Sequence, residues 1–600
     1  MRILDHNIKI GKFSKEFEDF KLSASITQAN DFKVEFSLKN ISNASKFVGD
    51  VTLSEFDSSE TLFMNNFQSW GPCTFAKPQE VLNLVQKMQF QREFMMSPIP
   101  WEFKNGVVSD YFIATDKEFA GFLSSKVAHP YFLWQNGIIK IKVYVGKELK
   151  PGEKIDLETL WFTRYESLEE TLDEYAKKVT NFNKPKIEKA IFGWSSWYHY
   201  YLDISQENFI KEIELSKTLG LNYELFQLDD GYEADIGDWL ETNEKFPDGL
   251  EYLAKKVKES GVIAGIWTAP FSISESSKLF RDHPDWVVKN ESGKPLLAYE
   301  NWNRKIYALD TTNPDAQRWL EDTFSTLKNY GFDFFKIDFL FAAIIPGRRH
   351  LNITPIEAYR IGMKTIRKAV GNSHILGCGA PLLPSIGYVN SMRIGSDRAP
   401  YWTSESDLGQ PSAKHSIRNA LTRNFMSGVW WTNDPDCVMA RSNDTKLNDD
   451  ERMVNVYIPA LLNGHFLQSD KLSSLSKEDV CLMKSALNFR DGKSYVKFID
   501  GERYVIISER SVNGDVLSFV NLSNSIWNVK MEDFSNLLSV KEDEFFISYP
   551  SMKETKPEQK SVKPHSILMI LHRGKRQMIR EDEKKKDGRD FHYYTSPGDK

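Results

Sequence analysis

An alternation of short apolar runs and amphipathic helices fills the middle of this 600-residue chain and restricts its fold more than any other feature. One helix has Asn313 as N-cap, Pro314 at its first position and Gly331 as terminator. The apolar runs lie at 190–197, 223–230, 262–270, 333–340, 374–379, 391–397, 428–436 and 465–470. Strand followed by helix, eight times over ~300 residues, predicts a (β/α)8 barrel. A doubly wound sheet is the alternative, but it rarely uses so many repeats.

Segments of predicted β structure flank the barrel on both sides. LWQNGIIKIKVYVG (133–146) has an Asn-Gly turn and places Ile139, Ile141, Val143 and Val145 on one strand face. After residue 492, YVKFIDGERYVIIS and RSVNGDVLSFVNLS contain Asp-Gly and Asn-Gly turns. We therefore predict a multidomain chain, divided into an N-terminal β-sandwich (1–165), a helical linker (166–187), the barrel domain (188–491) and a C-terminal all-β domain with a charged tail (492–600).

Composition excludes several classes of protein. The net charge of −6 argues against nucleic acid as a partner. The four cysteines form no CxxC pair or Cys/His cluster, so neither a zinc site nor a disulfide framework is predicted. The N-terminus lacks the apolar run of a signal peptide, and no stretch is long enough to span a membrane. We expect a soluble, cytoplasmic protein without metal or organic cofactor, and a homo-oligomer is compatible with the sequence.

Ionisable and aromatic side chains stand at the ends of the predicted barrel strands. The carboxyl ends of barrel strands carry the chemistry of such folds, and alternation along a strand puts Lys336 and Asp338 on the same side. A single aspartate there is more often a helix cap or an ion pair, and Asp434 and Asp470 are left with that interpretation. Several buried ionisable groups are costly unless they are paired, so their convergence predicts a polar pocket. The candidates are Trp197, Asp229, Asp230, Trp267, Lys336, Asp338, Cys378, Arg393 and Asp397.

Two carboxylates beside a pocket, without metal-ligand spacing, favour glycoside hydrolysis. Lys336 would stabilise the anion of Asp338, whereas Asp397 would need a raised pKa to act as an acid. Arg393 and Arg398 would oppose that rise if they lay close to Asp397. The sequence does not settle this conflict.

Seven motifs in order resemble glycoside hydrolase family 36, the retaining α-galactosidases. The resemblance covers the barrel from about 190 to 440 and extends into both flanking β domains. It rests on NNFQSWGP, GWSSWYHYY, FQLDDGYE, GIWTAPF, FKIDFLF, LGCGAPLLP and MRIGSD.

The resemblance implies a role for each candidate. Asp338 resembles the catalytic nucleophile and Asp397 the acid/base. Asp229 and Asp230 resemble the pair that holds sugar hydroxyls, and Cys378 a residue near the 2-hydroxyl. Further ligands or walls are implied for Lys336, Arg393, Trp267, Trp197 (favoured over Trp194) and Trp70. Specificity for the aglycone is expected to vary at AAIIPGRRH (342–350) and TSESD (403–407).

The resulting hypothesis is a retaining, exo-acting α-galactosidase acting on a small oligosaccharide through a covalent glycosyl-aspartate. The two carboxyl groups should then lie ~5 to 5.5 Å apart. The alternatives are an α-N-acetylgalactosaminidase, a galactosyl-transferring relative, and an inactive sugar-binding protein. A metal-dependent barrel hydrolase would need histidines at strand ends, and the 11 histidines do not fall there.

Overall fold

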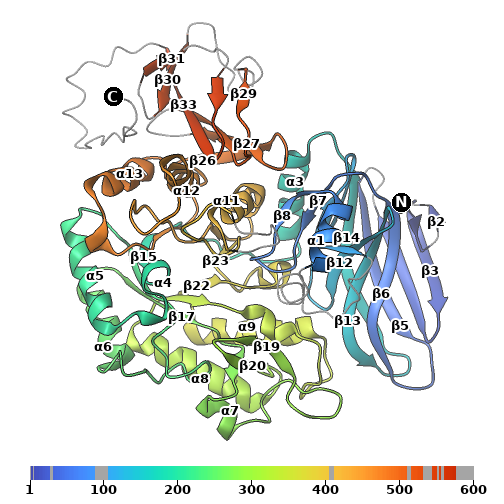
Figure 1. Cartoon of the computed structure of the whole chain (residues 1–600). Helices are drawn as coiled ribbons and strands as arrows, with labels where there is room; N and C mark the ends of the chain where they lie inside the picture. Colours follow the sequence, from blue (N-terminus) through green and yellow to red (C-terminus); the bar gives the residue numbers. More distant parts are fainter. Residues whose placement is uncertain are drawn as a thin grey trace.

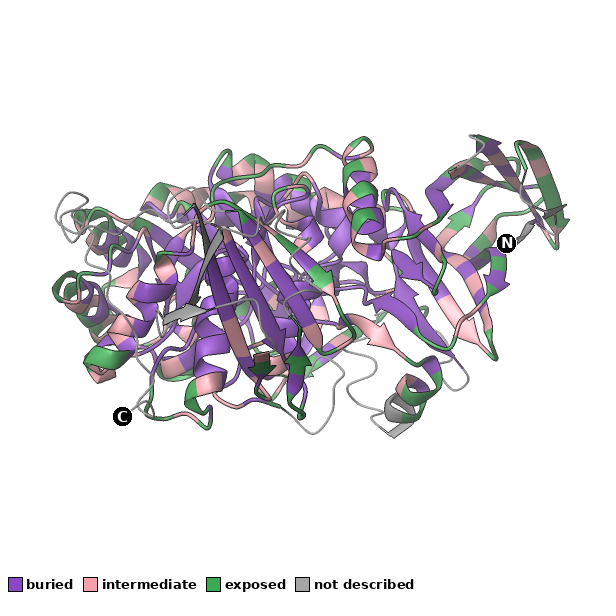
Figure 2. Cartoon of the chain, turned by 90° about the horizontal axis from the view of Figure 1, so that it is seen from above, coloured by how far each residue is buried: buried purple, intermediate pink, exposed green. Residues whose placement is uncertain are grey.

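The computed structural model of this chain contains an N-terminal β region, a central barrel and a C-terminal β region (Figure 1). A small three-stranded sheet is inserted in the barrel. The structure describes residues 2–575 except 5, 8, 28–30, 88–105, 404–410, 510–514, 531–543, 550–552 and 556–559. The buried residues form a continuous interior through the barrel and the adjoining sheets (Figure 2). Within this described part, no helix has both the length and the apolar character needed to cross a membrane.

The N-terminal region consists of two antiparallel sheets and helix α1 (Pro78–Lys87). The strands are β1 Arg2–Ile3, β2 His6–Asn7, β3 Gly11–Phe17, β4 Phe20–Thr27, β5 Phe32–Asn40, β6 Lys46–Asp57, β7 Leu62–Asn65, β8 Cys73–Ala76, β9 Val107–Asp110, β10 Phe112–Ala114, β11 Glu118–Phe122, β12 His129–Gln135, β13 Ile138–Leu149 and β14 Lys154–Arg164. One sheet has the order β2-β1-β6-β13-β12-β9, and the other the order β3-β4-β5-β14-β11-β10-β7-β8.

The predicted Asn-Gly hairpin is confirmed between β12 and β13. Asn136 and Gly137 have φ values of 49° and 83°, as a two-residue primed turn requires. The side chains that the alternation assigned to one face of β13 are all buried, namely Ile139, Ile141, Val143 and Val145. Helix α3 (Leu168–Thr180), capped by the Ser167 side chain, then leads to the barrel.

Eight parallel strands form the nearly closed barrel, as predicted. They are β15 Phe192–Ser195, β16 Leu225–Leu228, β17 Ile263–Thr268, β21 Phe334–Ile337, β22 His374–Gly377, β23 Ser391–Arg393, β24 Thr432–Asp434 and β25 Phe466–Gln468. Their order is β24-β23-β22-β21-β17-β16-β15-β25. Beside the gap between β24 and β25, the amide of His465 donates to the carbonyl of Asn433 at 2.9 Å.

Helices surround the barrel where the apolar periodicity predicts them. In α8, the Asn313 side chain accepts from the amides of Asp315 and Ala316, and Gly331 ends the helix with φ 114°. Helix α9 begins with a capping box of Thr354 and Glu357. The helices are α4 Trp197–Tyr200, η2 Tyr201–Asp203, α5 Gln206–Thr218, α6 Gly249–Glu259, α7 Lys278–Asp282, α8 Pro314–Tyr330, η3 Leu340–Ile344, α9 Pro355–Val370, α10 Leu382–Ser385, α11 Ala413–Thr422, η4 Asn424–Met426, α12 Asp449–Leu461, η5 Leu472–Ser474 and α13 Lys477–Leu487.

A small sheet inserted between β17 and α8 was not predicted. It contains β18 (Ser272–Ser274), β19 (Leu297–Asn301) and β20 (Arg304–Ala308) in the order β18-β20-β19. The β19–β20 hairpin turns at Trp302 and Asn303, which have φ values of 52° and 56°. Neither residue is the glycine that usually marks such a turn, and the hairpin is therefore not predictable from a turn motif.

The C-terminal region packs against the barrel helices through β26 and β33 (Figure 1). Its described strands are β26 Lys493–Phe498, β27 Arg503–Glu509, β28 Asp515–Asn521, β29 Trp527–Val529, β30 Glu544–Tyr549, β31 Lys553–Thr555, β32 Lys560–Val562 and β33 Ser566–Lys575. The predicted Asp-Gly turn lies between the paired strands β26 and β27. The predicted Asn-Gly turn at 513–514 and the charged tail at 580–600 lie outside the described residues.

Candidate active site

A cavity of about 1010 Å³ opens at the carboxyl ends of the barrel strands. It brings together side chains from the N-terminal region, the strand ends and the inserted hairpin. Its lining comprises Trp70, Trp197, Leu202, Asp229, Asp230, Trp267, Glu275, Glu300, Asn301, Trp302, Asn303, Arg304, Lys305, Lys336, Asp338, Phe339, Asp397 and Pro411. Eight of the ten residues predicted for the site are in this list, and Cys378 and Arg393 lie behind it.

The Asp338 carboxyl group is held through both of its oxygens. Oδ1 accepts from the amide of Phe339 at 2.7 Å, and Oδ2 accepts from Nε1 of Trp267 at 3.1 Å. Phe339 adopts a left-handed backbone conformation with φ 52°, which turns the chain sharply after β21. A Cβ on Gly379 would lie 3.3 Å from Oδ1 of Asp338, so a side chain there would crowd the carboxylate. The strand end therefore presents Asp338, 6% exposed, in one fixed orientation.

Asp397 sits in a different environment. Its Oδ1 accepts from Nη2 of Arg393 at 2.7 Å, and its side chain is 41% exposed where it lines the cavity. Withdrawal from bulk water raises the pKa of Asp397, and Arg393 opposes that rise. The negative charges of Asp436 and Asp338 raise the pKa further, so the pKa of Asp397 lies above its ordinary value.

The arginines that the sequence left in conflict with this role occupy distinct places. Arg393 also donates to Asp436, which therefore takes up part of its charge. The guanidinium of Arg398 donates instead to the carbonyls of Asn455 and Pro435, at 2.7 and 3.0 Å. Only one of the two arginines thus contacts Asp397 through its side chain, and that one is shared with a second carboxylate.

Lys336, on β21, forms its ion pair with Asp229 at the end of β16, two strands away, rather than with Asp338. Its Nζ lies 2.8 Å from Oδ2 of Asp229, and the two side chains are 8% and 3% exposed. Asp229 also accepts from Gln227 Nε2 at 2.6 Å and from the hydroxyl of Ser195 at 3.3 Å. Burial alone would lower the pKa of Lys336, but the charge of Asp229 raises it well above the ordinary value. Lys336 is therefore a buried cation.

Asp230 carries the neighbouring carboxyl group. Its Oδ2 accepts from Nε1 of Trp302 at 2.8 Å, and its buried Oδ1 has no hydrogen-bond partner among the residues that the structure describes. Burial raises the pKa of Asp230 well above its ordinary value, and the charge of Glu233 adds to the rise. The bond from Trp302 acts in the opposite direction, because it stabilises the anion.

The aromatic candidates divide between the cavity wall and the core. Trp197, Trp267 and Trp70 line the cavity. Trp194 is fully buried and donates to the carbonyl of Asp470 at 2.9 Å. Trp197 is therefore the wall residue of the GWSSW motif, and Trp194 belongs to the core.

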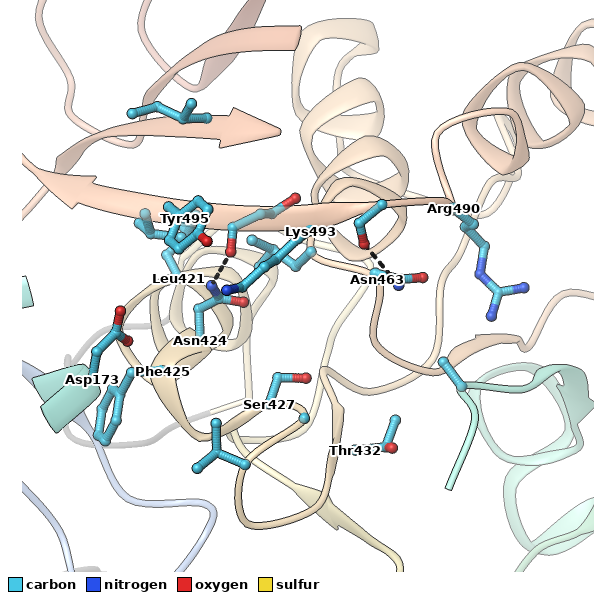
Figure 3. Close-up of a pocket in the computed structure, with 18 of the residues that line it drawn as sticks. Asp173, Leu421, Asn424, Phe425, Ser427, Thr432, Asn463, Arg490, Lys493 and Tyr495 are labelled. Carbon is cyan, nitrogen blue, oxygen red and sulfur yellow. Dashed lines mark hydrogen bonds between the residues drawn. The ribbon is translucent and has the colours of Figure 1, made fainter. Parts of the chain in front are cut away.

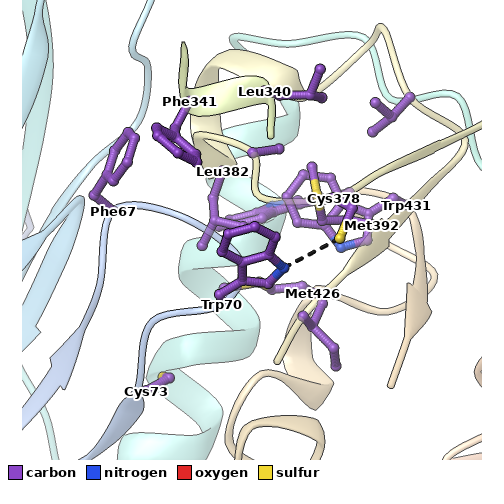
Figure 4. Close-up of a cluster of buried hydrophobic side chains, with 14 of the residues drawn as sticks. Phe67, Trp70, Cys73, Leu340, Phe341, Cys378, Leu382, Met392, Met426 and Trp431 are labelled. Atoms are coloured by element: carbon purple, nitrogen blue, oxygen red, sulfur yellow. Dashed lines mark hydrogen bonds between the residues drawn. The ribbon is translucent and has the colours of Figure 1, made fainter. Parts of the chain in front are cut away.

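Trp70 links the N-terminal region to the barrel strands. Its Nε1 donates to Sγ of Cys378 at 3.3 Å, and Figure 4 shows this bond within the cluster of apolar side chains beside the cavity. The loop that carries Trp70 is fixed on barrel segments, because the amide of Ser69 donates to the carbonyl of Ala380 at 3.1 Å. Burial raises the pKa of the Cys378 thiol well above its ordinary value. Cys378 is therefore a neutral thiol in contact with Trp70, which lines the cavity.

Asp434 and Asp470 keep the structural role that the sequence assigned to them. Asp470 accepts from the amide of Ala440 at 2.8 Å and from Arg441 at 3.1 Å. Asp434 accepts from the amide of Asp436 at 3.0 Å, and burial raises its pKa to about 6.

Sequence reasoning missed Trp302, Phe339 and Asp436. Asp436 lies two residues beyond Asp434, and its carboxylate contacts both Arg393 and the hydroxyl of Tyr198. The stretch 342–350, expected to vary with the aglycone, contributes no residue to the described cavity lining. Residues 404–407 of the other such stretch lie outside the described residues.

A second cavity, of about 1770 Å³, lies at the amino ends of the strands (Figure 3). It is bounded by α3, the segment before β15, η4 and β26, and it contains none of the predicted site residues. No group of three or more potential metal ligands occurs within the part of the chain that the structure describes.

Comparison with known proteins gives matches in both the N-terminal region and the barrel. A family model described as "Alpha-galactosidase, N-terminal" matches residues 31–162, and a model described as "Melibiase" matches residues 166–366. α-Galactosidase AgaA of Geobacillus stearothermophilus is 32% identical over 140 residues, which are 22% of this chain and 18% of that protein. The matched segments span about a fifth of the length of the first curated relatives.

Solved structures match over more of the chain. TtGalA, an α-galactosidase from Thermus thermophilus in complex with p-nitrophenyl α-D-galactopyranoside, has a TM-score of 0.63 at 25% identity and covers 83% of this chain and 98% of its own. A variant of the Geobacillus family 36 enzyme AgaA has a TM-score of 0.61 at 15% identity over 92% of this chain and 82% of its own, a likeness of fold. The two family models together match more than half of the residues, and this chain belongs to the α-galactosidases of glycoside hydrolase family 36.

Proposed function

We propose that this protein is a retaining, exo-acting α-galactosidase that removes terminal α-linked galactose from oligosaccharides. The observation that carries the proposal is the contrast between two carboxyl groups that line one cavity. Asp338 is held by two hydrogen-bond donors, whereas burial and neighbouring charges raise the pKa of Asp397. A double-displacement glycosidase needs one carboxylate as nucleophile and one carboxylic acid as proton donor.

Two complexes of one relative support the choice of substrate. The Thermus thermophilus α-galactosidase was solved with p-nitrophenyl α-D-galactopyranoside and with stachyose, an oligosaccharide. A pocket closed at one end by strand-borne polar groups suits a terminal sugar, with the remainder of the oligosaccharide extending toward the mouth.

In the first step, a carboxylate oxygen of Asp338 attacks the anomeric carbon. The bond from that carbon to the glycosidic oxygen breaks, and the proton of Asp397 passes to the departing oxygen. A covalent β-galactosyl ester of Asp338 is the result. The hydrogen bonds from Trp267 and Phe339 fix the attacking group beforehand, which lowers the entropic part of the barrier.

In the second step, ionised Asp397 takes a proton from water while the water oxygen attacks the anomeric carbon. The ester bond breaks, and Asp338 leaves as a carboxylate. Two inversions restore the α configuration of the released galactose. Both steps balance with the two carboxyl groups and water alone, so no cofactor enters the proposal.

Buried polar groups around Asp229 would select the sugar. Asp229, Asp230 and Lys336 offer acceptors and a donor to hydroxyls at the closed end of the cavity. An epimer would leave one of these groups without a partner, and such a mismatch can cost several kcal/mol in the transition state.

Proton NMR of aryl α-galactoside hydrolysis tests the proposal. We expect α-galactose to appear first and the β anomer to follow only by mutarotation. First release of β-galactose would overturn the retaining mechanism, and no hydrolysis would overturn the activity itself. An aryl α-N-acetylgalactosaminide under the same conditions is the control for the related specificity, and we expect no turnover of it.

A further inference from the structure

The inserted hairpin holds its tip in an unfavourable backbone conformation over the cavity. Trp302 and Asn303, the two central residues of its turn, both have positive φ values, as a two-residue primed turn requires. Asparagine often adopts such values, whereas tryptophan adopts them at a cost. The turn places the indole of Trp302 in contact with residues of the site.

Trp302 joins the hairpin to both carboxyl-bearing strand ends. Its Nε1 donates to Oδ2 of Asp230 at 2.8 Å. Its ring centroid lies 4.9 Å from that of Phe339, the residue that follows Asp338, and 6.4 Å from that of Trp267, which donates to Asp338. One side chain therefore spans the wall between the two aspartates.

The hairpin is itself braced and does not hang free. The rings of Tyr299 and Phe339 stack at 5.5 Å with an interplanar angle of 7°, and the Tyr299 hydroxyl lies 2.7 Å from that of Ser272. Arg304, on the other side of the tip, forms an ion pair with Asp235. The position of Trp302 is thus fixed from both strands of the hairpin.

Asp230 depends on this contact. The carboxyl groups of Glu233 and Asp229 lie near Asp230, and their negative charges disfavour the ionised form of Asp230. The indole N–H of Trp302 donates to Oδ2 of Asp230 and stabilises its anion, whereas the Glu233 carboxyl group opposes that charge. Asp230 and Trp302 both line the cavity, so a substrate hydroxyl bound by Asp230 would lie beside the Trp302 ring.

We propose that Trp302 is a positioning and specificity-determining residue. It orients Asp230 and closes the cavity behind the hydroxyl that Asp230 holds, so that only galactose unsubstituted at that hydroxyl is accepted. This inference rests on the proposed function and assigns to the hairpin the exclusion of substituted or internal galactose units. The positioning and the closure reside in different parts of the indole, namely the N–H group and the ring.

Two substitutions separate those parts. Trp302→Phe keeps a ring and removes the N–H group, and Trp302→Ala removes both. The substrates are p-nitrophenyl α-galactoside and its 4-O-methyl and 6-O-methyl derivatives. Trp319→Phe is the matched control, because it makes the same chemical change on α8, where Trp319 is packed against the core and does not line the cavity.

For Trp302→Phe, we expect KM for the unsubstituted substrate to rise roughly fivefold, with kcat within about twofold, as the loss of a binding interaction predicts. For Trp302→Ala, we expect the kcat/KM of at least one methylated substrate, relative to the unsubstituted one, to rise about tenfold or more, because the wall is gone. A merely structural residue would lower all three activities together. Thermal unfolding of each variant checks that it is folded.

An unchanged KM in Trp302→Phe would overturn the positioning role. Unchanged rejection of both methylated substrates by Trp302→Ala would overturn the closure. In either case the proposed function stands if the unmodified protein hydrolyses p-nitrophenyl α-galactoside. If the unmodified protein hydrolyses none of the three substrates, the proposed function fails and the inference fails with it.

Discussion

The two ends of the barrel both carry a cavity and a lysine–carboxylate pair, but the pairs differ in their exposure. At the carboxyl end, the Lys336 and Asp229 side chains are 8% and 3% exposed and lie 2.8 Å apart. At the amino end, the Lys189 and Glu224 side chains are 86% and 41% exposed and lie 3.3 Å apart. The amino-end cavity is the larger of the two, at about 1770 Å³ against about 1010 Å³.

Cavity size therefore does not identify the site in this molecule. What distinguishes the carboxyl end is that its ion pair is buried. Removing two charges from water costs free energy, and removing one partner of such a pair strongly lowers the stability of the folded protein. An exposed pair is screened by water and contributes little. Substitutions at the two ends should accordingly have very different effects on activity, on pH dependence and on stability.

The largest effect is expected from Asp338→Gly. If Asp338 is the nucleophile, as proposed, its loss should lower kcat on p-nitrophenyl α-galactoside by about 10⁴-fold or more, as for removal of other enzymatic nucleophiles. Azide in the assay should restore product formation by occupying the space of the carboxylate, and it should give the β-galactosyl azide after a single inversion. Substantial azide-independent activity, or an azide product of α configuration, would show that Asp338 is not the nucleophile.

A large effect on stability is expected from Lys336→Met. The substitution leaves Asp229 buried without its cation, and breaking a buried pair in this way costs about 3–5 kcal/mol. The thermal unfolding transition should shift down accordingly. A shift no larger than that of an exposed lysine variant would remove the distinction between the two ends.

The strand ends were predictable because they follow from residues close together in the sequence. The alternation of side chains along a strand placed Lys336 and Asp338 on one side, and the cap and terminator residues of α8 marked where that helix begins and ends. Eight apolar runs, mostly separated by helices, then left few alternatives to a barrel. Asp229, Asp338 and Asp397 consequently line one cavity, as the barrel predicts.

Contacts between distant segments were not predictable from those rules. Lys336 pairs with a residue 107 positions earlier in the chain, because β21 and β16 are separated in the barrel by β17 alone. Trp302 had no signal, because its turn lacks glycine and a tryptophan is usually a core residue. Asp436 had no signal either, because its ion pair with Arg393 joins residues 43 positions apart in the chain.

A moderate effect, on pH dependence, is expected from Asp436→Asn. Partial withdrawal from bulk water inside the cavity is the main cause of the raised pKa of Asp397, whose side chain is still partly exposed, and the charge of Asp436 contributes to it. Removing that charge leaves Arg393 free to stabilise ionised Asp397, so the pKa of Asp397 should fall. Because the acid form is needed in the first step, the basic limb of kcat/KM should move to lower pH by about one unit.

The matched control for this shift is Asp434→Asn, two residues earlier. Asp434 is buried next to the same turn, whereas Arg393 bridges Asp397 to Asp436. We expect its basic limb to move by less than about half a unit. A basic limb that moves to higher pH in Asp436→Asn, or moves equally in both variants, would contradict the assignment of Asp397 as the acid.

The smallest effect is expected from Lys189→Met at the amino end. Lys189 and Glu224 are exposed to water, and such pairs contribute about 0–1 kcal/mol, so the unfolding transition should hardly move. Activity on p-nitrophenyl α-galactoside should equal that of the unmodified protein, because the amino-end cavity shares no lining residue with the carboxyl-end cavity. A loss of activity at unchanged stability would mean that the larger cavity communicates with the catalytic end. The contrast between buried and exposed charge would then not explain where the chemistry takes place.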